Sequence, residues 1–118
     1  MKVIIAGSRS ITDKESTFEL LDKAKEYFGS ISVVISGCAN GVDKIGEEWA
    51  ELNNIEVQRF PADWDKYGKK AGFIRNSEMA KAADGLIAIY DGISKGTKNM
   101  IDTMKKLGKE WYVCTVLK

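Results

Sequence analysis

Short apolar runs alternate with longer amphipathic segments along the 118-residue chain. Five runs are apolar on consecutive or nearly consecutive residues, as is typical of strands that are covered on both faces. These runs are Val3–Ala6, Ile31–Ile35, Ile55–Phe60, Leu86–Tyr90 and Trp111–Val116. Their alternation with helix-like segments predicts βαβ units and a parallel sheet.

The segments between the runs place apolar residues three and four positions apart, as amphipathic helices do. The predicted helices are approximately Lys14–Phe28, Val42–Asn53, Phe73–Ala82 and Thr97–Leu107. Gly29 and Gly108 follow the first and the last of them, where helix C-caps usually lie. Right-handed crossovers then give a five-stranded parallel sheet of order 3-2-1-4-5 in a Rossmann-like three-layer α/β sandwich.

Composition and charge narrow the class of protein. Hydrophobic residues make up 44% of the chain and charged residues 30%, which suits a single domain over residues 1–118. Lys and Arg number 18 against 17 for Asp and Glu, and this balance argues against nucleic acid as a partner. The chain has no His, the commonest general base and metal ligand, so we expect neither a metal site nor a cofactor.

Two features bear on the compartment. Cys38 and Cys114 lie far apart without a C-x-x-C pair, which favours free thiols in a reducing cytosol. The apolar run at Met1–Gly7 is too short for a signal peptide or a membrane span. We therefore expect a cytoplasmic protein without a membrane partner.

Ligands of open parallel sheets bind beyond the carboxyl ends of the strands where the winding reverses, here between the first and fourth strands. The loop after the first strand begins Gly7-Ser8-Arg9. Gly7 permits close backbone approach, Ser8 offers a hydroxyl, and Arg9 can bind a phosphate with two parallel hydrogen bonds. An ordinary polar turn, with Ser10 or Thr12 capping the next helix, is the alternative.

The loop after the second strand, Ser36–Asp43, leads into a predicted helix whose first amides and dipole favour anions. Asp43 falls in the first helical turn, where a carboxylate is favourable without a ligand, and it could also accept a ribose hydroxyl. Gly37 and Gly41 could equally serve only a tight turn. The candidate ligand-binding residues here are Ser36, Gly37, Cys38, Asn40, Gly41 and Asp43.

The loop after the fourth strand, Asp91–Thr97, resembles a phosphate cradle because glycines and hydroxyls precede the free amides of a helix N-terminus. Its candidate residues are Asp91, Gly92, Ser94, Lys95, Gly96 and Thr97. Neither the Walker A pattern nor the dinucleotide G-x-G-x-x-G pattern is present. A solvated turn with Thr97 as N-cap is the alternative.

The long connection after the third strand adds aromatic and basic candidates. Trp64 could stack on a base, or it could simply pack against the sheet edge. Arg75 and Asn76, near the start of a predicted helix, could reach phosphate or ribose. We expect Lys69 and Lys70 to form a solvated face.

Several ordered motifs together resemble the YspA/YpsA-related branch of the SLOG (Smf/DprA-LOG) superfamily over nearly the whole chain. The motifs are Gly7-Ser8-Arg9, Ser36-Gly37-x-Ala39-x-Gly41-x-Asp43, Pro61-Ala62-Asp63-Trp64, Ala71-Gly72-x-x-Arg75-Asn76-x-x-Met79, Ala83-Asp84 and Asp91-Gly92-x-Ser94-x-Gly96-Thr97. The resemblance implies a Rossmann-like fold and a pocket for nucleotide-derived ligands, such as signals derived from NAD or ADP-ribose or a cyclic relative.

The LOG-type phosphoribohydrolases of that superfamily carry R-x-x-x-M and, later, P-G-G-x-G-T-x-x-E. Arg75 and Met79 match the first pattern and Gly96-Thr97 match part of the second, but Met100 stands where the glutamate belongs. A thioether cannot stabilise an oxocarbenium-like charge or transfer a proton. The favoured function is therefore binding of a nucleotide-derived molecule, for sensing or sequestration, without LOG-type catalysis.

Two alternative functions stay open. A nucleotide N-glycosidic or phosphoester hydrolase could use another carboxylate, of which the candidates are Asp43, Glu47, Glu48, Glu78 and Asp102. Single-stranded DNA binding follows by analogy with the DNA-processing branch, although aromatic and basic residues do not alternate along one stretch. A homodimer or homotetramer is also expected, with the helix faces of Trp49 and Met104 as candidate contacts, although a helix-face tryptophan more often belongs to the core.

Overall fold

The computed structural model describes residues 1–116. Its strands are Lys2–Gly7 (β1), Val33–Ser36 (β2), Glu56–Arg59 (β3), Gly85–Tyr90 (β4) and Glu110–Thr115 (β5). They form one sheet of order β3-β2-β1-β4-β5 in which all neighbouring strands run parallel. This order confirms the predicted Rossmann-like α/β fold.

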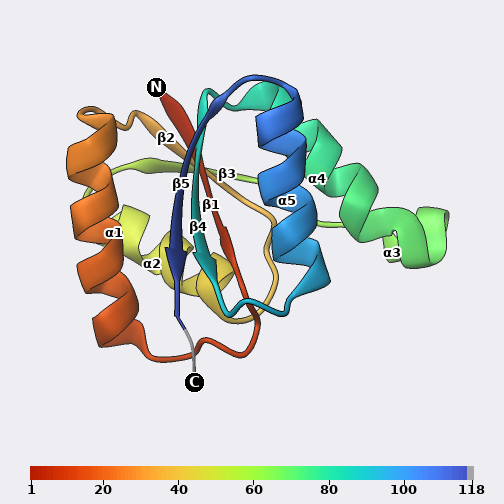
Figure 1. Cartoon of the computed structure of the whole chain (residues 1–118), viewed down its shortest axis with the longest axis horizontal. Coiled ribbons are helices and arrows are strands. Elements are labelled where there is room, and N and C mark those ends of the chain that lie inside the picture. Colours follow the sequence, from red (N-terminus) through yellow and green to blue (C-terminus); the bar gives the residue numbers. More distant parts are fainter. Residues whose placement is uncertain (117–118) are drawn as a thin grey trace.

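Helices cover both faces of the sheet. One face carries α1 (Lys14–Phe28) and α2 (Val42–Leu52), and the other carries α4 (Ala71–Ala82) and α5 (Lys95–Lys106), as Figure 1 shows. Successive side chains of a strand point to opposite faces, so the central strand β1 supplies both cores. Val3 and Ile5 belong to the core under α1 and α2, whereas Ile4 and Ala6 belong to the core under α4 and α5.

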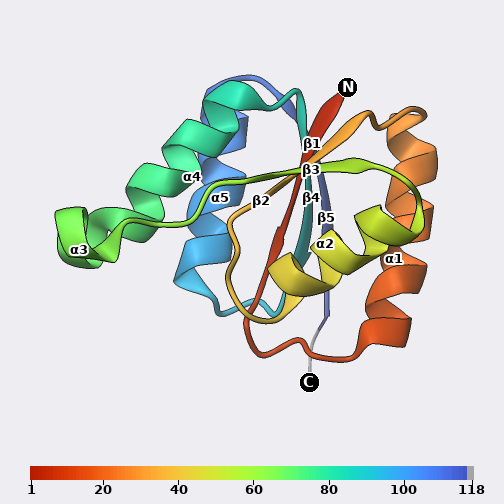
Figure 2. The same ribbon diagram turned by 180° about the vertical axis from the view of Figure 1, so that it is seen from behind.

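The connection after β3 contains helical structure that the apolar pattern does not predict. A single turn, α3 (Trp64–Tyr67), and a 3-10 turn, η1 (Gly68–Lys70), lead directly into α4. The Asp63 carboxylate caps α3 by accepting a hydrogen bond from Lys66 N at 3.1 Å. α3 buries none of its residues, so it has no apolar stripe to detect, and it projects from the body of the molecule (Figures 1 and 2).

Capping residues determine where the helices begin and end. Gly29 ends α1 with φ of 77°, as predicted for a C-cap glycine, and its N–H donates to Lys25 O. α5 starts two residues before the predicted Thr97, because Ser94 is its N-cap and accepts a hydrogen bond from Thr97 N at 3.4 Å. The last helix therefore presents Lys95 and Gly96 as its first two residues.

Trp49 and Met104 do not form contact surfaces for self-association. Trp49 is 2% exposed and donates from Nε1 to Asp22 Oδ1 at 2.9 Å, and Met104 is fully buried. Both residues pack inside the two cores, so the prediction that their helix faces mediate assembly is wrong. Within residues 1–116, no helix has both the length and the apolar character needed to cross a membrane.

Candidate functional site

A two-lobed cleft opens at the carboxyl ends of the strands, where the winding reverses between β1 and β4. The first lobe has a volume of about 350 Å³ and is lined by the β1–α1 and β4–α5 loops, the start of α2, and α4. The second lobe, of about 240 Å³, lies over the β2–α2 loop. Four residues line both lobes and so join them: Arg9, Ala39, Trp64 and Arg75.

The structure brings most of the predicted site residues to this cleft. Those in the first lobe are Gly7, Arg9, Asp43, Trp64, Arg75, Asn76, Asp91, Ser94, Gly96 and Thr97. The second lobe adds Gly37, Cys38 and Asn40. The remaining candidates, which line neither lobe, are Ser8, Ser36, Gly41, Gly92 and Lys95.

Ser8 and Ser36 are buried hydroxyls that hold the loops together. Ser8 Oγ accepts a hydrogen bond from Asp91 N at 3.0 Å and so ties the β1–α1 loop to the β4–α5 loop. Ser36 Oγ donates to Glu47 Oε2 at 2.7 Å and accepts from Cys38 N at 3.1 Å. Both side chains are fully buried, so the structure does not place either hydroxyl where a ligand could contact it.

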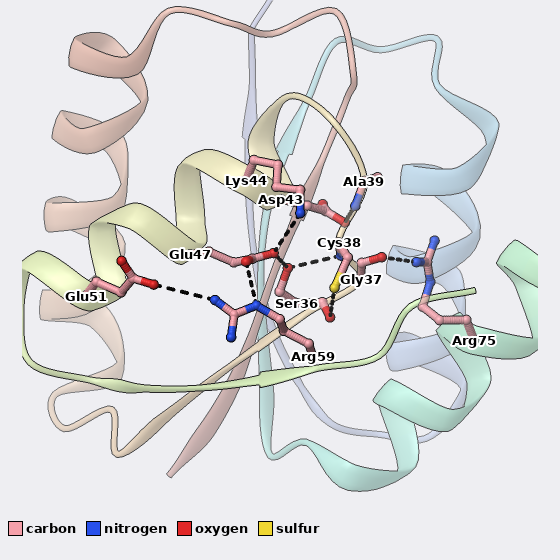
Figure 3. A network of polar contacts seen from close by, with 10 residues as sticks. All are labelled: Ser36, Gly37, Cys38, Ala39, Asp43, Lys44, Glu47, Glu51, Arg59 and Arg75. Atoms are coloured by element: carbon pink, nitrogen blue, oxygen red, sulfur yellow. Dashed lines mark hydrogen bonds and ion pairs between the residues drawn. The ribbon is translucent and has the colours of Figure 1, made fainter. Parts of the chain in front are cut away.

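Glu47 is the centre of a polar network behind the β2–α2 loop (Figure 3). Besides Ser36, its carboxylate accepts a hydrogen bond from Arg59 Nε at 2.8 Å. Its side chain is only 8% exposed, and the ion pair with Arg59 compensates a buried charge that would otherwise be costly. Glu47 therefore braces the loop rather than facing the cleft, and it is a poor substitute for the missing LOG-type glutamate.

The β4–α5 loop differs from the predicted phosphate cradle in one respect. Asp91 Oδ1 accepts hydrogen bonds from Ile93 N at 2.9 Å and Ser94 N at 2.8 Å. These bonds, more than any other cause, lower the pKa of Asp91 to about 2. Two amides of the loop thus bind the chain's own carboxylate, whereas the amides of Lys95 and Gly96, at the first two helical positions, have no intrahelical acceptor.

Arg75 enters the cleft from α4 and is held in place by its neighbours. Its Nη1 donates to the Gly37 carbonyl oxygen, and its Nε donates to Asn76 Oδ1 at 3.1 Å. Asn76 Nδ2 in turn donates to Gly96 O at 3.2 Å, so Asn76 links the guanidinium to the first turn of α5. All the polar atoms of Asn76 are used in this bracing, and its effect on a ligand would act through Arg75.

Arg9 and Arg75 both line the cleft where its two lobes join. Burial lowers the pKa of Arg75, the Asp43 carboxylate opposes this shift, and the positive charge of Arg9 adds to it. Among residues 1–116, no salt bridge joins Arg9, Arg75 or the cleft residue Lys69 to a carboxylate. The cleft therefore contains cationic groups that the protein itself leaves without ion-pair partners.

Asp43 is the buried carboxylate of the first lobe, with an exposure of 5%. One oxygen, Oδ2, accepts a hydrogen bond from Ala39 N at 3.2 Å, and the nearby Gly7 backbone also lowers the pKa of this carboxyl. Burial nevertheless raises the pKa of Asp43 to about 6, because the hydrogen bonds and Arg75 only partly offset desolvation. At neutral pH this side chain is a buried anion that costs stability.

Asp43→Asn should stabilise the protein above pH 6 and have little effect below pH 4. A carboxyl whose folded-state pKa is raised contributes stability below its unfolded pKa of 3.8, and that contribution is lost as pH rises through about 6. We expect the free energy of unfolding to rise by about 2–3 kcal/mol at pH 8. Urea denaturation of both proteins at pH 4 and pH 8 measures this, and an equal difference at both values would contradict it.

Two residues that the sequence assigned elsewhere also line the first lobe. Phe73 begins the predicted helix Phe73–Ala82, yet it is 50% exposed and lines the cleft, as does Trp64, which is 51% exposed. Lys69, expected on a solvated face, lines the same lobe. Lys69 lies in η1, which the apolar pattern does not indicate.

Comparison with known proteins identifies the family. The model of the YspA, cpYpsA-related SLOG family (YAcAr) matches residues 1–67. The chain belongs to this family. The Gene 61 protein of Mycobacterium phage D29 is 35% identical over 113 residues, which cover 91% of this chain and 90% of that protein. The resemblance inferred from the motifs is thereby confirmed, and the relative matches this SLOG-family chain over almost its full length.

Two solved structures of DNA processing protein A (DprA) share the fold. The Streptococcus pneumoniae protein has a TM-score of 0.73 and 17% identity, with 95% of this chain and 49% of that chain covered. The Helicobacter pylori protein has a TM-score of 0.66 and 23% identity, with coverages of 96% and 64%. This SLOG-family chain thus spans about half to two thirds of the DprA chains that it matches.

The prediction that net charge argues against a nucleic-acid partner is wrong. The Helicobacter pylori DprA structure is described by its single-stranded DNA binding mode, so a domain of this fold occurs in a protein that binds nucleic acid. A formal net charge of +1 averages over the whole chain. It does not report the local set of unpaired cations, Arg9, Lys69 and Arg75, at the cleft.

Proposed function

We propose that this chain binds a nucleotide-derived small molecule, such as ADP-ribose, another NAD derivative or a cyclic relative, and holds it without LOG-type hydrolysis. The observation that carries this proposal is that two arginines without a carboxylate partner, Arg9 and Arg75, both line the cleft where its two lobes join. A phosphate or pyrophosphate between them would relieve their repulsion and accept bidentate hydrogen bonds. Sequestering the ligand, or signalling its presence to a partner, would be the role.

Two residues near the proposed phosphate site argue against LOG-type hydrolysis. Met100 lines the first lobe at the position where LOG-type enzymes have glutamate, and a thioether transfers no proton. Glu47 is engaged with Arg59 and Ser36. Trp64 and Phe73 offer exposed aromatic faces on which a base could stack.

A thermal-shift panel tests this proposal. AMP, ADP-ribose, NAD and a cyclic dinucleotide are added to the protein, with adenosine as the control that lacks phosphate. A ligand at 100 times its Kd stabilises the folded state by about 2.7 kcal/mol, so the melting temperature should rise by several degrees for at least one phosphate-bearing ligand. No stabilisation at millimolar concentration would overturn the proposal, and release of free base during incubation would support a hydrolase instead.

Single-stranded DNA binding is the second candidate, favoured by the exposed aromatics Trp64 and Phe73 beside Lys69 in one cleft. Stacking platforms next to cations are typical of proteins that bind single strands. The fold similarity to DprA agrees with this candidate. Salt-dependent binding of an oligo-dT strand, lost in Trp64→Ala, would support it, whereas no binding at low salt would exclude it.

A further inference from the structure

Asp43 is a buried anion with hydrogen-bonding capacity left over. It lines the first lobe at 5% exposure, and its Oδ2 accepts a hydrogen bond from Ala39 N at 3.2 Å. An ionised carboxylate has about four lone-pair sites, so more than one site of this side chain stays open to another donor. Among residues 1–116, no salt bridge includes Asp43. A ligand in the cleft can therefore donate hydrogen bonds to the Asp43 carboxylate.

The side chains of Arg75 and Asp43 both lie next to Gly37, as Figure 3 shows. A Cβ atom built on Gly37 would lie 2.7 Å from Arg75 Nη1 and 2.9 Å from Asp43 Oδ2. The cation that would take a phosphate is thus next to the carboxylate. In a nucleotide, the group joined directly to the phosphate is the sugar, so phosphate at Arg75 brings the sugar to Asp43.

The chemistry of Asp43 decides which part of a ligand it accepts. A phosphate there would place two anions together in a poorly solvated site, which is unfavourable. A vicinal diol is suitable, because its two hydroxyls can donate to the carboxylate. Ribose presents such a diol, whereas an internal nucleotide of a DNA strand has no 2′-hydroxyl and has its 3′-oxygen esterified.

We infer that Asp43 makes the cleft selective for free ribonucleotides by accepting hydrogen bonds from the ribose diol. This inference rests on the proposed nucleotide-binding function and specifies its ligand class. It also separates the two candidate functions, since a DNA strand would leave the Asp43 carboxylate buried without an added donor, at a cost in affinity.

Isothermal titration with AMP and with 2′,3′-dideoxy-AMP tests the inference. The two probes carry the same base and phosphate and differ only in the diol. The wild-type protein should bind AMP about 10- to 100-fold more tightly, the range expected for hydrogen bonds to a charged acceptor. In Asp43→Asn this preference should fall to a few-fold, while Glu51→Gln, which neutralises an exposed carboxylate on the same helix, should keep it.

Each outcome has a distinct meaning. Equal affinity of the wild-type protein for the two probes, or an undiminished preference in a folded Asp43→Asn variant, would overturn the role of Asp43 and leave nucleotide binding standing. If neither probe binds at millimolar concentration, the role of Asp43 and binding of mononucleotides at this cleft fail together. Melting curves of both variants establish that they are folded.

Discussion

Replacing Arg75 with alanine should weaken the binding of a phosphate-bearing nucleotide by about 100-fold. A hydrogen bond between charged partners contributes about 1.5–3 kcal/mol, and a planar guanidinium can make two of them to one phosphate. Arg9 would remain, but a single exposed arginine on a loop cannot reproduce the site. Isothermal titration with the best ligand of the thermal-shift panel measures the loss.

Two further variants show whether the Arg75 effect belongs to phosphate recognition. Arg75→Lys keeps the charge but loses the fork, so we expect an intermediate loss of about tenfold. Lys106→Ala removes an exposed cation at the far end of α5 and should leave affinity unchanged. Unchanged affinity in a folded Arg75→Ala protein would contradict the assigned phosphate site.

Arg75→Ala should also cost some stability, because the Gly37 carbonyl oxygen and Asn76 Oδ1 lose a donor. Leaving a partly buried acceptor unpaired costs about 1–3 kcal/mol. Titrations are therefore done well below the melting temperature of the variant. A loss of affinity that persists under these conditions reports recognition rather than unfolding.

Gly41→Ala should destabilise the protein by about 3 kcal/mol or more, the largest stability effect that we expect from a small substitution. Gly41 is the N-cap of α2 with φ of 79° and ψ of −130°, a conformation that is essentially restricted to glycine. An added Cβ would lie 2.6 Å from Ser8 O and 2.7 Å from Arg9 Cα, which are backbone atoms that no rotamer change can move. Chemical denaturation of the variant gives the free energy of unfolding.

Gly96→Ala is the matched control for that substitution. Gly96 lies in the first turn of α5, and a Cβ there would meet no atom within 4 Å. Alanine is the better helix former, so this change should leave the free energy of unfolding unchanged or raise it by up to about 1 kcal/mol. Equal effects of Gly41→Ala and Gly96→Ala on the free energy of unfolding would show that the close contact of Gly41 with the β1–α1 loop does not contribute to stability.

The sheet could be predicted because short stretches of sequence specify each of its strands. Consecutive apolar residues such as Ile4 and Ile5 specify a strand buried on both faces, and the βαβ rules then fix the strand order. The same topology brings the loops after β1, β2 and β4 to one edge. The position of the cleft therefore followed from the sequence.

The individual roles within the cleft were harder to predict, since a small polar residue at a strand end can serve either a ligand or the protein. The Ser8 hydroxyl bonds to the β4–α5 loop, the Ser36 hydroxyl bonds to Glu47 of α2, and Asp91 accepts hydrogen bonds from two amides that a phosphate could have used. Only the three-dimensional structure shows whether such a group bonds to the protein or is left for a ligand. Phe73 was predicted only as the first residue of a helix, because helical period cannot tell a core face from the wall of an open cleft.

An NMR titration tests the central claim most directly, namely that phosphate binds between Arg9 and Arg75 where the two lobes join. ADP-ribose is added to ¹⁵N-labelled protein, and the backbone amides and arginine Nε signals are followed. The largest shifts should fall on the Arg75 Nε and on the amides of Arg9, Ala39, Lys95 and Gly96. Shifts centred on the outer edge of β5 or on α1, or no shifts at millimolar ligand, would contradict it.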